Sequence, residues 1–156
     1  MRRSEREITQ RDKLLELLDQ CRVMHLGLTD GAAPYVVPLH YGWEEREGGI
    51  ALYFHSAPEG RKMDCVRRNP SCFIAVTGDT RVIGSAEACG WTAAYESLMM
   101  EGEIEVLKSD EDKKHGLDTL MRHCGYVGEP RYNAQALAKT AVCRVRVKSV
   151  TGKRRE

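Results

Sequence analysis

The segment from Leu52 to Lys62 carries the residues best suited to chemistry. A strand-like run ends in His55 and Ser56, a Pro–Gly turn follows, and the next two residues are the cations Arg61 and Lys62. Helix N-termini present unpaired N–H groups and partial positive charge, so they attract phosphate. Two cations in a first helical turn oppose the helix dipole unless an anion is bound. The pattern indicates a phosphate site, and a solvated basic turn is the alternative because no G-x-x-x-x-G-K-[ST] loop is present.

A second segment, Pro34 to Trp43, places a proline inside an apolar strand. Pro38 has no N–H to give to a sheet ladder, so it predicts an edge strand or a bulge. Free backbone groups at such an edge can meet the hydrogen-bonding rim of a planar ligand. From spacing alone, a simple edge strand that guards against aggregation is the favoured interpretation.

His40 and His55 are the candidate acid catalysts. Neither has a nucleophile or a carboxylate at a fixed sequence spacing, so a catalytic triad is not supported. An imidazole with an ordinary pKa of ~6.5 can still donate a proton to a substrate, and a packing or cofactor-orienting role is the equal alternative. The six cysteines form no C-x-x-C pair and have no histidine at zinc-finger spacing, so we expect reduced thiols and no metal site.

Length and charge exclude several classes of protein. The 156 residues predict one domain, and 24 basic against 23 acidic residues give a formal charge of +1, which argues against a dedicated nucleic-acid binder. No run of roughly 18 apolar residues predicts a membrane span, and the N-terminal sequence is not a secretory signal. We therefore expect a soluble, cytoplasmic protein with no membrane partner.

Periodicity predicts alternating strands and helices. An amphipathic helix is expected over 12–21 with Thr9 as its N-cap, a helix between Gly60 and Asn69, a helix capped by Ser109 and Asp112, and a short helix over 134–139. Six strands are expected over 23–28, 35–41, 50–55, 72–76, 95–107 and 141–150. Residues 44–49 are expected to be a polar loop, and residues 77–94 have no clear pattern. Hairpin-linked strands of this kind favour a mostly antiparallel sheet or barrel.

These segments together resemble a known family. The runs Pro34–Leu39 and Leu52–Ala57, followed by Gly60-Arg61-Lys62 and Asn69-Pro70, are similar to the FMN-binding split-barrel superfamily of pyridoxamine 5′-phosphate oxidase-like proteins. The resemblance is greatest to its nitroimidazole-resistance (Nim-type) branch, which the opening Met1–Ile8 and the closing Val150–Arg154 also resemble.

The resemblance implies a fold, an assembly and a cofactor site. The fold would be a mostly β, six-stranded antiparallel split β-barrel with flanking helices, formed by residues 1–156 as a single FMN-binding domain. It would be a homodimer with FMN at the subunit interface. The implied cofactor-binding residues are Val37, Pro38, Leu39 and His40 at the isoalloxazine edge, His55 and Ser56 near the ribityl chain or ring, Arg61 and Lys62 on the phosphate, and Ser97 and Met99 from the partner subunit.

Three functions remain open at this stage. The first is an FMN-dependent oxidoreductase that uses NAD(P)H to reduce small acceptors such as 5-nitroimidazoles or other nitroaromatics, with the hard chemistry carried by the cofactor. The second is a non-catalytic protein that binds or senses flavin or a related cofactor, such as a deazaflavin or heme, and the third is an interaction protein with an empty barrel. Oxidation of pyridoxamine 5′-phosphate is a further alternative, although the Arg-rich segment of the true oxidases does not follow Thr151–Arg154.

Overall fold

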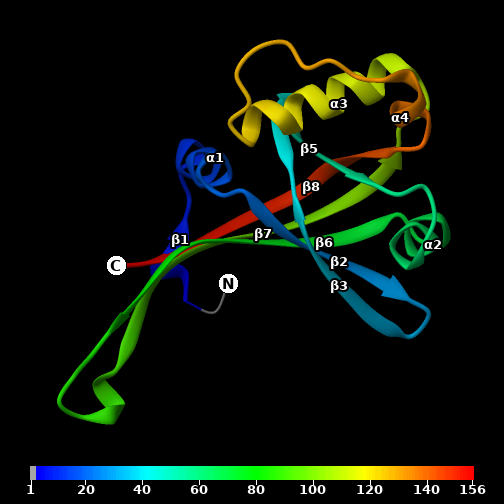
Figure 1. Cartoon of the computed structure of the whole chain (residues 1–156). Helices are drawn as coiled ribbons and strands as arrows, with labels where there is room; N and C mark the ends of the chain where they lie inside the picture. Colours follow the sequence, from blue (N-terminus) through cyan, green and yellow to red (C-terminus); the bar gives the residue numbers. More distant parts are fainter. Residues whose placement is uncertain (1–2) are drawn as a thin grey trace.

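The computed structural model describes residues 3–156 as an antiparallel sheet with flanking helices (Figure 1). The strands are β1 (Glu7–Ile8), β2 (Val23–Asp30), β3 (Ala33–His40), β4 (Gly42–Arg46), β5 (Gly49–Ser56), β6 (Ser71–Ile83), β7 (Thr92–Val106) and β8 (Ala141–Arg155). The α-helices are α1 (Arg11–Gln20), α2 (Arg61–Arg68), α3 (Asp110–His123) and α4 (Ala134–Ala138), and the 3₁₀ turns are η1 (Ser4–Arg6) and η2 (Ala88–Gly90). Among these residues, no helix combines the length and the apolar character needed to cross a membrane.

The sheet has eight strands, so the expected number of six was wrong. The order is β3-β2-β6-β7-β8-β5-β4, with β1 paired to β8, and the sheet is open because β3 and β4 are its ends. The two additional strands are β1 and β4. Residues 44–46, expected in a loop, continue β4 because they pair with Gly49–Ala51 of β5, and the actual turn is Glu47–Gly48, where both residues have positive φ.

The core lies on the concave side of the sheet, as the alternation in β7 predicts. Leu98 and Met100 are fully buried there, whereas Met99, between them, is 44% exposed. Strand β5 is buried on both faces: Phe54 faces the main core, while Tyr53 packs in a second cluster under α3. Close packing of α3 explains this, since a Cβ at Gly116 would lie 2.9 Å from the Tyr53 ring.

The helices match expectation apart from one cap. Ser109 accepts a hydrogen bond from the Asp112 N–H at the start of α3, as predicted. Thr9 is not the N-cap of α1; that position is Gln10, which makes no side-chain cap bond. The shift follows from β1, because pairing of Ile8 with Gly152 of β8 holds the chain extended up to the helix.

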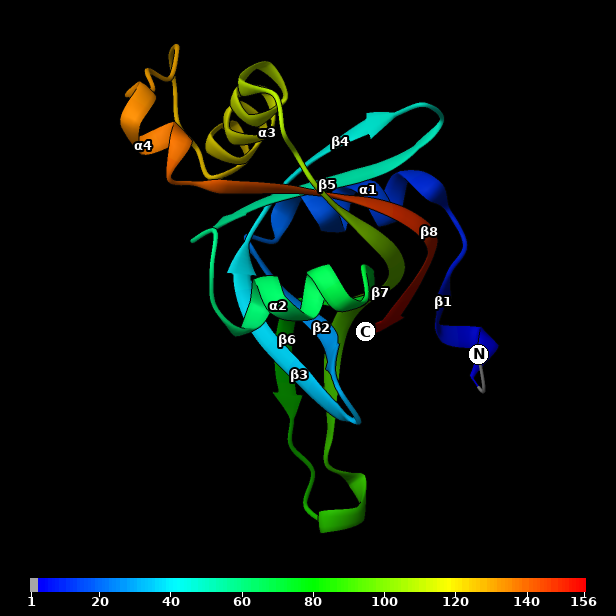
Figure 2. The ribbon, with the colours of Figure 1, turned by 90° about the vertical axis from the view of Figure 1, so that its right-hand side faces the viewer.

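Strands β6 and β7 run beyond the body of the sheet as a projecting hairpin arm, residues 79–92 (Figures 1 and 2). This is the stretch that had no clear pattern. The arm begins at a register shift between Thr77 and Thr80. At its tip the Trp91 indole donates a hydrogen bond to the Ser85 carbonyl at 2.8 Å and remains 59% exposed. The arm therefore presents the exposed ring of Trp91, which this hydrogen bond holds in place.

Candidate functional site

Helix α2 begins between two strands that are not neighbours in the sheet. The Arg61 guanidinium lies 4.5 Å from the centroid of the Tyr35 ring on β3, and the Lys62 ammonium lies 5.7 Å from the Phe54 ring on β5. Figure 2 shows α2 lying beside β2 and β3. The two adjacent cations predicted to bind phosphate therefore stand at the opening between β3 and β5.

The backbone at this helix start is suited to an anion. Gly60 precedes the helix with φ +107°, a conformation that favours glycine, and it offers no side chain to cap the first turn. The first N–H groups of a helix have no intrahelical partner. Without a side-chain cap, these donors of α2 are free for a ligand at the positive end of the helix dipole.

Arg61 already has an anionic partner. Its Nε donates to Asp30 Oδ2 at 2.7 Å, and Arg68 Nη2 donates to the other oxygen at 2.6 Å. These hydrogen bonds hold the pKa of the Asp30 carboxyl below its usual value. Sequence reasoning missed Asp30, because it lies 31 residues before Arg61 and only the packing of α2 on β2 brings the two together.

Lys62 differs from Arg61, because it is desolvated and has no counter-ion. Burial lowers the pKa of its ammonium group. Within residues 3–156, no carboxylate lies within 4.0 Å of its Nζ. A partly buried cation without a partner is unfavourable, and a bound anion relieves that cost. The donor set of Lys62, Arg61 and free helix N–H groups fits a phosphate group.

His55 and Ser56 are at the end of β5, directly before the turn into α2. Ser56 is half-buried and has the same strand parity as Phe54, so it belongs to the Lys62 side of the strand. His55 has the opposite parity, pairs with Val142 of β8 and is exposed. The structure therefore places both residues where β5 leads into α2, with Ser56 on the face nearer Lys62 and His55 on the opposite face.

Strand β3 is an edge strand, as Pro38 predicts, since it pairs only with β2. Of the four residues from Val37 to His40, Val37 and Leu39 pack against the main core, and Pro38 and His40 direct their side chains outward. The His40 Nδ1 lies 3.0 Å from the Arg22 carbonyl oxygen. His40 is five residues beyond Tyr35, roughly 16 Å along an extended strand. Within one copy, His40 therefore lies well away from Arg61 at the start of α2.

Ser97 and Met99 lie on the outer face of β7, opposite Leu98 and Met100, as the alternation predicts. The cross-strand row through Met99 contains Ala75, His25 and Pro38. Thus the residues expected from a partner subunit share a sheet face with Pro38 of the edge strand.

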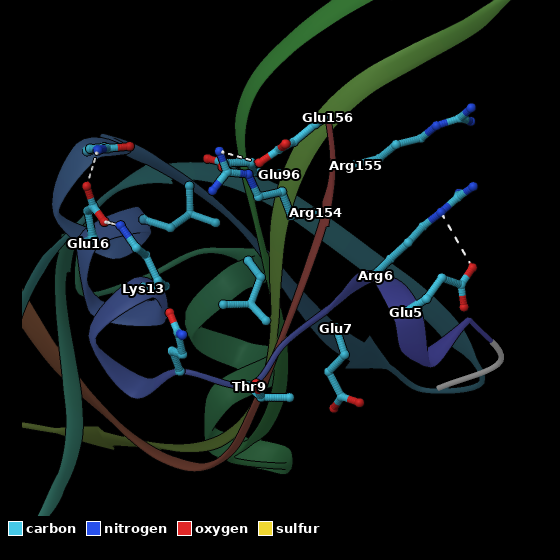
Figure 3. Close-up of a pocket in the computed structure, with 14 residues that line it drawn as sticks. Glu5, Arg6, Glu7, Thr9, Lys13, Glu16, Glu96, Arg154, Arg155 and Glu156 are labelled. Atoms are coloured by element: carbon cyan, nitrogen blue, oxygen red, sulfur yellow. Dashed lines mark hydrogen bonds and ion pairs between the residues drawn. The ribbon is translucent and has the colours of Figure 1, made fainter.

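The most voluminous of the described cavities lies elsewhere, between α1, the N-terminal residues and the end of β8 (Figure 3). It measures about 720 Å³. Two of its cations are paired: Lys13 pairs with Glu16 at 2.7 Å, and Arg154 pairs with Glu96 at 3.0 Å. No residue predicted to bind cofactor lines it. Figure 3 draws Arg155 and Glu7 without an ion pair; Lys62 is distinguished by burial, which lowers the pKa of its ammonium group.

A polar network under α3 was also missed by sequence reasoning. Glu44 Oε1 accepts a hydrogen bond from the Tyr53 hydroxyl at 2.7 Å, and the His115 Nε2 lies 3.0 Å from both carboxylate oxygens. The pKa of Tyr53 is raised to about 12, mainly by burial and next by the Glu44 carboxylate. The network links α3 to β4 and β5, so its role is structural: it holds the helix on the sheet.

The comparisons with known proteins agree with this geometry. The open, antiparallel sheet with flanking helices is consistent with the split-barrel fold. The helix α2, which begins with two basic residues, lies beside this sheet. The family model described as pyridoxamine 5′-phosphate oxidase matches residues 10–154. The chain therefore belongs to the pyridoxamine 5′-phosphate oxidase-like family. No curated protein matches the chain.

Several solved structures are similar. A candidate 5-nitroimidazole antibiotic resistance protein from Bacteroides thetaiotaomicron is 30% identical, with a TM-score of 0.83 over 94% of this chain and 85% of that one. The FAD and heme binding protein from Mycobacterium smegmatis has a TM-score of 0.84 at 22% identity, over 97% of this chain and 74% of that one. A NimC/NimA family protein from Clostridium acetobutylicum has a TM-score of 0.56 at 18% identity, over 90% and 81%.

Proposed function

We propose that this protein is a homodimeric FMN-binding reductase of small acceptors such as 5-nitroimidazoles. The observation that carries the proposal is Lys62, a desolvated ammonium group with no carboxylate partner, at the uncapped start of α2. A phosphate monoester supplies the charge that this position needs. Family membership and the similar FAD and heme binding protein support the choice of a flavin over other phosphates, and the 30% identical nitroimidazole-resistance relative supports the choice of acceptor.

The residues at the α2 end have separable roles in this proposal. Lys62 and Arg61 hold the phosphate, with Arg61 oriented by its bond to Asp30. Ser56, which is half-buried at the end of β5, donates a hydrogen bond from its hydroxyl group to the phosphate or the ribityl chain. When bound, FMN supplies the transfer of hydride or electrons from NAD(P)H to the acceptor, so the protein needs to provide only binding, orientation and electrostatics.

The outer face of the sheet supports the homodimer. The exposed large apolar side chains on β2, β3, β6 and β7, namely Val23, Val36, Phe73, Val82 and Met99, share this one face. Exposed large apolar side chains that gather on one sheet face are typical of interaction sites. A two-fold dimer uses the same patch on both copies, so Ser97 and Met99 of one copy face the flavin held by the other.

The test begins with the protein as purified from cells. Its absorption spectrum and the mass of the released ligand should identify FMN, and these data also separate FMN from FAD, deazaflavin or heme. NADH and NADPH oxidation is then measured with and without a 5-nitroimidazole. Acceptor-dependent turnover supports the reductase. Bound flavin without turnover supports a binding or sensing protein instead, and failure of the apo protein to bind added FMN overturns the proposal.

The two histidines are assigned by separate substitutions. We expect His55→Ala to lower nitro reduction at least about tenfold with full FMN occupancy, because positioned acid catalysis contributes about 10²–10⁴-fold. His40 lies away from the α2 end of its own copy, so it acts at the flavin only if the partner brings it there. Loss of FMN in proportion to rate would make either histidine a binding residue, and no effect on either quantity would remove it from the site.

A further inference from the structure

Another cation without an ion pair, Lys153 on β8, lies beside Ser97, which is expected to contact the flavin from the partner subunit. Lys153 is the direct cross-strand partner of Ser97 on β7. Side chains at such paired positions are about 4.5–5.5 Å apart at Cβ and share one sheet face. Lys153 therefore belongs to the same outer face as Ser97 and Met99.

The position of Lys153 is fixed by a neighbouring tyrosine. Its ammonium group lies 5.6 Å from the centroid of the Tyr95 ring, which is a cation–π distance. Arg6 Nη1 donates to the Tyr95 hydroxyl at 3.5 Å. The pKa of the Tyr95 phenol is lowered, mainly by the hydrogen bond from Arg6 and next by Lys153. The aromatic ring thus holds the lysine between β7 and the N-terminal segment.

This local charge is not neutralised by a carboxylate. Glu7 of β1 is opposite Lys153 in the sheet register, yet no ion pair within 4.0 Å joins Lys153 to any acidic residue in the described chain from Arg3 onward. In contrast, Lys148 on the same strand lies 2.8 Å from the Glu103 carboxylate. Of these two lysines of β8, Lys153 alone is available to an anion.

We propose that Lys153 stabilises the negative charge of the reduced flavin bound by the other copy of the chain. The inference rests on the proposed function, in which Ser97 of one copy faces the flavin held by the other. Hydride transfer oxidises the reduced nicotinamide and places two electrons and one proton on the flavin, which leaves the reduced ring anionic. The Lys153 ammonium keeps its proton throughout and forms no covalent bond; it acts only through charge and hydrogen bonding.

The test compares Lys153→Met, Lys153→Arg and Lys148→Met as dimeric holoproteins. Loss of one charge-assisted hydrogen bond that forms fully only in the reduced state should shift the oxidised-to-reduced equilibrium at least about tenfold. For a two-electron couple, tenfold corresponds to about 30 mV, so the FMN potential of Lys153→Met should fall by at least this amount. Lys153→Arg should retain the wild-type value. Lys148→Met removes the same charge from the same strand and should also retain it.

If Lys153→Met binds FMN too weakly for its potential to be measured, the affinities for oxidised and reduced FMN give the same information. The dissociation constants of oxidised and reduced FMN, titrated separately under anaerobic conditions, close a thermodynamic cycle with the potential. We expect the variant to lose at least about ten times more affinity for reduced than for oxidised FMN. Equal losses for both forms, or an unchanged potential in a flavin-bound dimer, would overturn the role of Lys153 and leave the proposed function standing. Absence of FMN binding in the wild type would instead overturn the proposed function.

Discussion

Two cation-rich regions of the molecule contrast in how their charges are balanced. The cavity in Figure 3 is large and charged, yet Lys13 and Arg154 have carboxylate partners at 2.7 and 3.0 Å. The start of α2 does not line that cavity, and there Lys62 is desolvated and unpaired while Arg61 shares Asp30 with Arg68.

The contrast indicates which physical quantity identifies a binding site here. Exposed ion pairs contribute little stability and leave little charge for a ligand. A desolvated cation raises the free energy of the apo protein, and this cost is recovered when an anion binds. Unbalanced charge at α2 is therefore our criterion, ahead of cavity volume, for the proposed phosphate site, and the same criterion selects Lys153 over Lys148 on β8.

Removing both cations at α2 should have the largest effect. Each charge-assisted hydrogen bond to phosphate is worth about 1.5–3 kcal/mol, so Arg61→Ala combined with Lys62→Ala should weaken FMN binding at least about a hundredfold. The matched control is Lys13→Ala combined with Arg154→Ala, which removes two cations from the Figure 3 cavity. Fluorescence titration should give the control a wild-type affinity. Equal losses in the two double variants would indicate a general charge effect and would break the contrast.

A single substitution of Lys62 should weaken ligand binding and stabilise the apo protein. Lys62→Met should bind FMN about tenfold more weakly, since one charge-assisted bond is lost. Without FMN, the variant should unfold at higher denaturant concentration, because a desolvated charge is replaced by an apolar chain.

The pH dependence of this stability difference has a defined sign. A lysine whose pKa is lowered in the folded state destabilises that state fully below the folded pKa, and the penalty disappears above the unfolded value of about 10.4. The advantage of apo Lys62→Met over wild type should therefore be greatest near neutral pH and shrink as the pH rises towards that value. An advantage that grows with pH in denaturant titrations would contradict the desolvation account.

Disrupting an ion pair in the Figure 3 cavity should have the smallest effect. Glu96→Gln removes the partner of Arg154, whose side chain is about half exposed. Pairs of this kind are worth about 0–1 kcal/mol, so the free energy of unfolding should change by less than that amount and FMN affinity should not change. A tenfold loss of FMN affinity in Glu96→Gln would require a ligand role for this cavity.

Periodicity was sufficient for the elements that form the core. The alternation around Leu98 and Met100, and the Ser109 cap, reflect contacts that lie close in sequence or repeat along one strand, and the structure confirms them. Strand β4 was missed because Glu44-Glu45-Arg46 has no apolar alternation; its pairing with β5 supplies the order instead. The extension of β6 to Ile83 was missed for the same reason, because residues 77–81 have no apolar alternation and hairpin pairing with β7 supplies the order.

The candidate site was predicted only in part. The local pattern around Gly60, Arg61 and Lys62 was sufficient for a basic helix start, and the structure confirms the helix. That pattern carried no information about Asp30, or about the difference in desolvation between the two adjacent cations, because both depend on tertiary packing.

The central claim, a phosphate site at the start of α2, is tested most directly by comparing two ligands that differ only in the phosphate. FMN and riboflavin are titrated into the same wild-type apo protein by calorimetry at one salt concentration. If Lys62 and Arg61 hold the phosphate, FMN should bind at least about a hundredfold more tightly than riboflavin. Equal affinities for FMN and riboflavin would contradict the account.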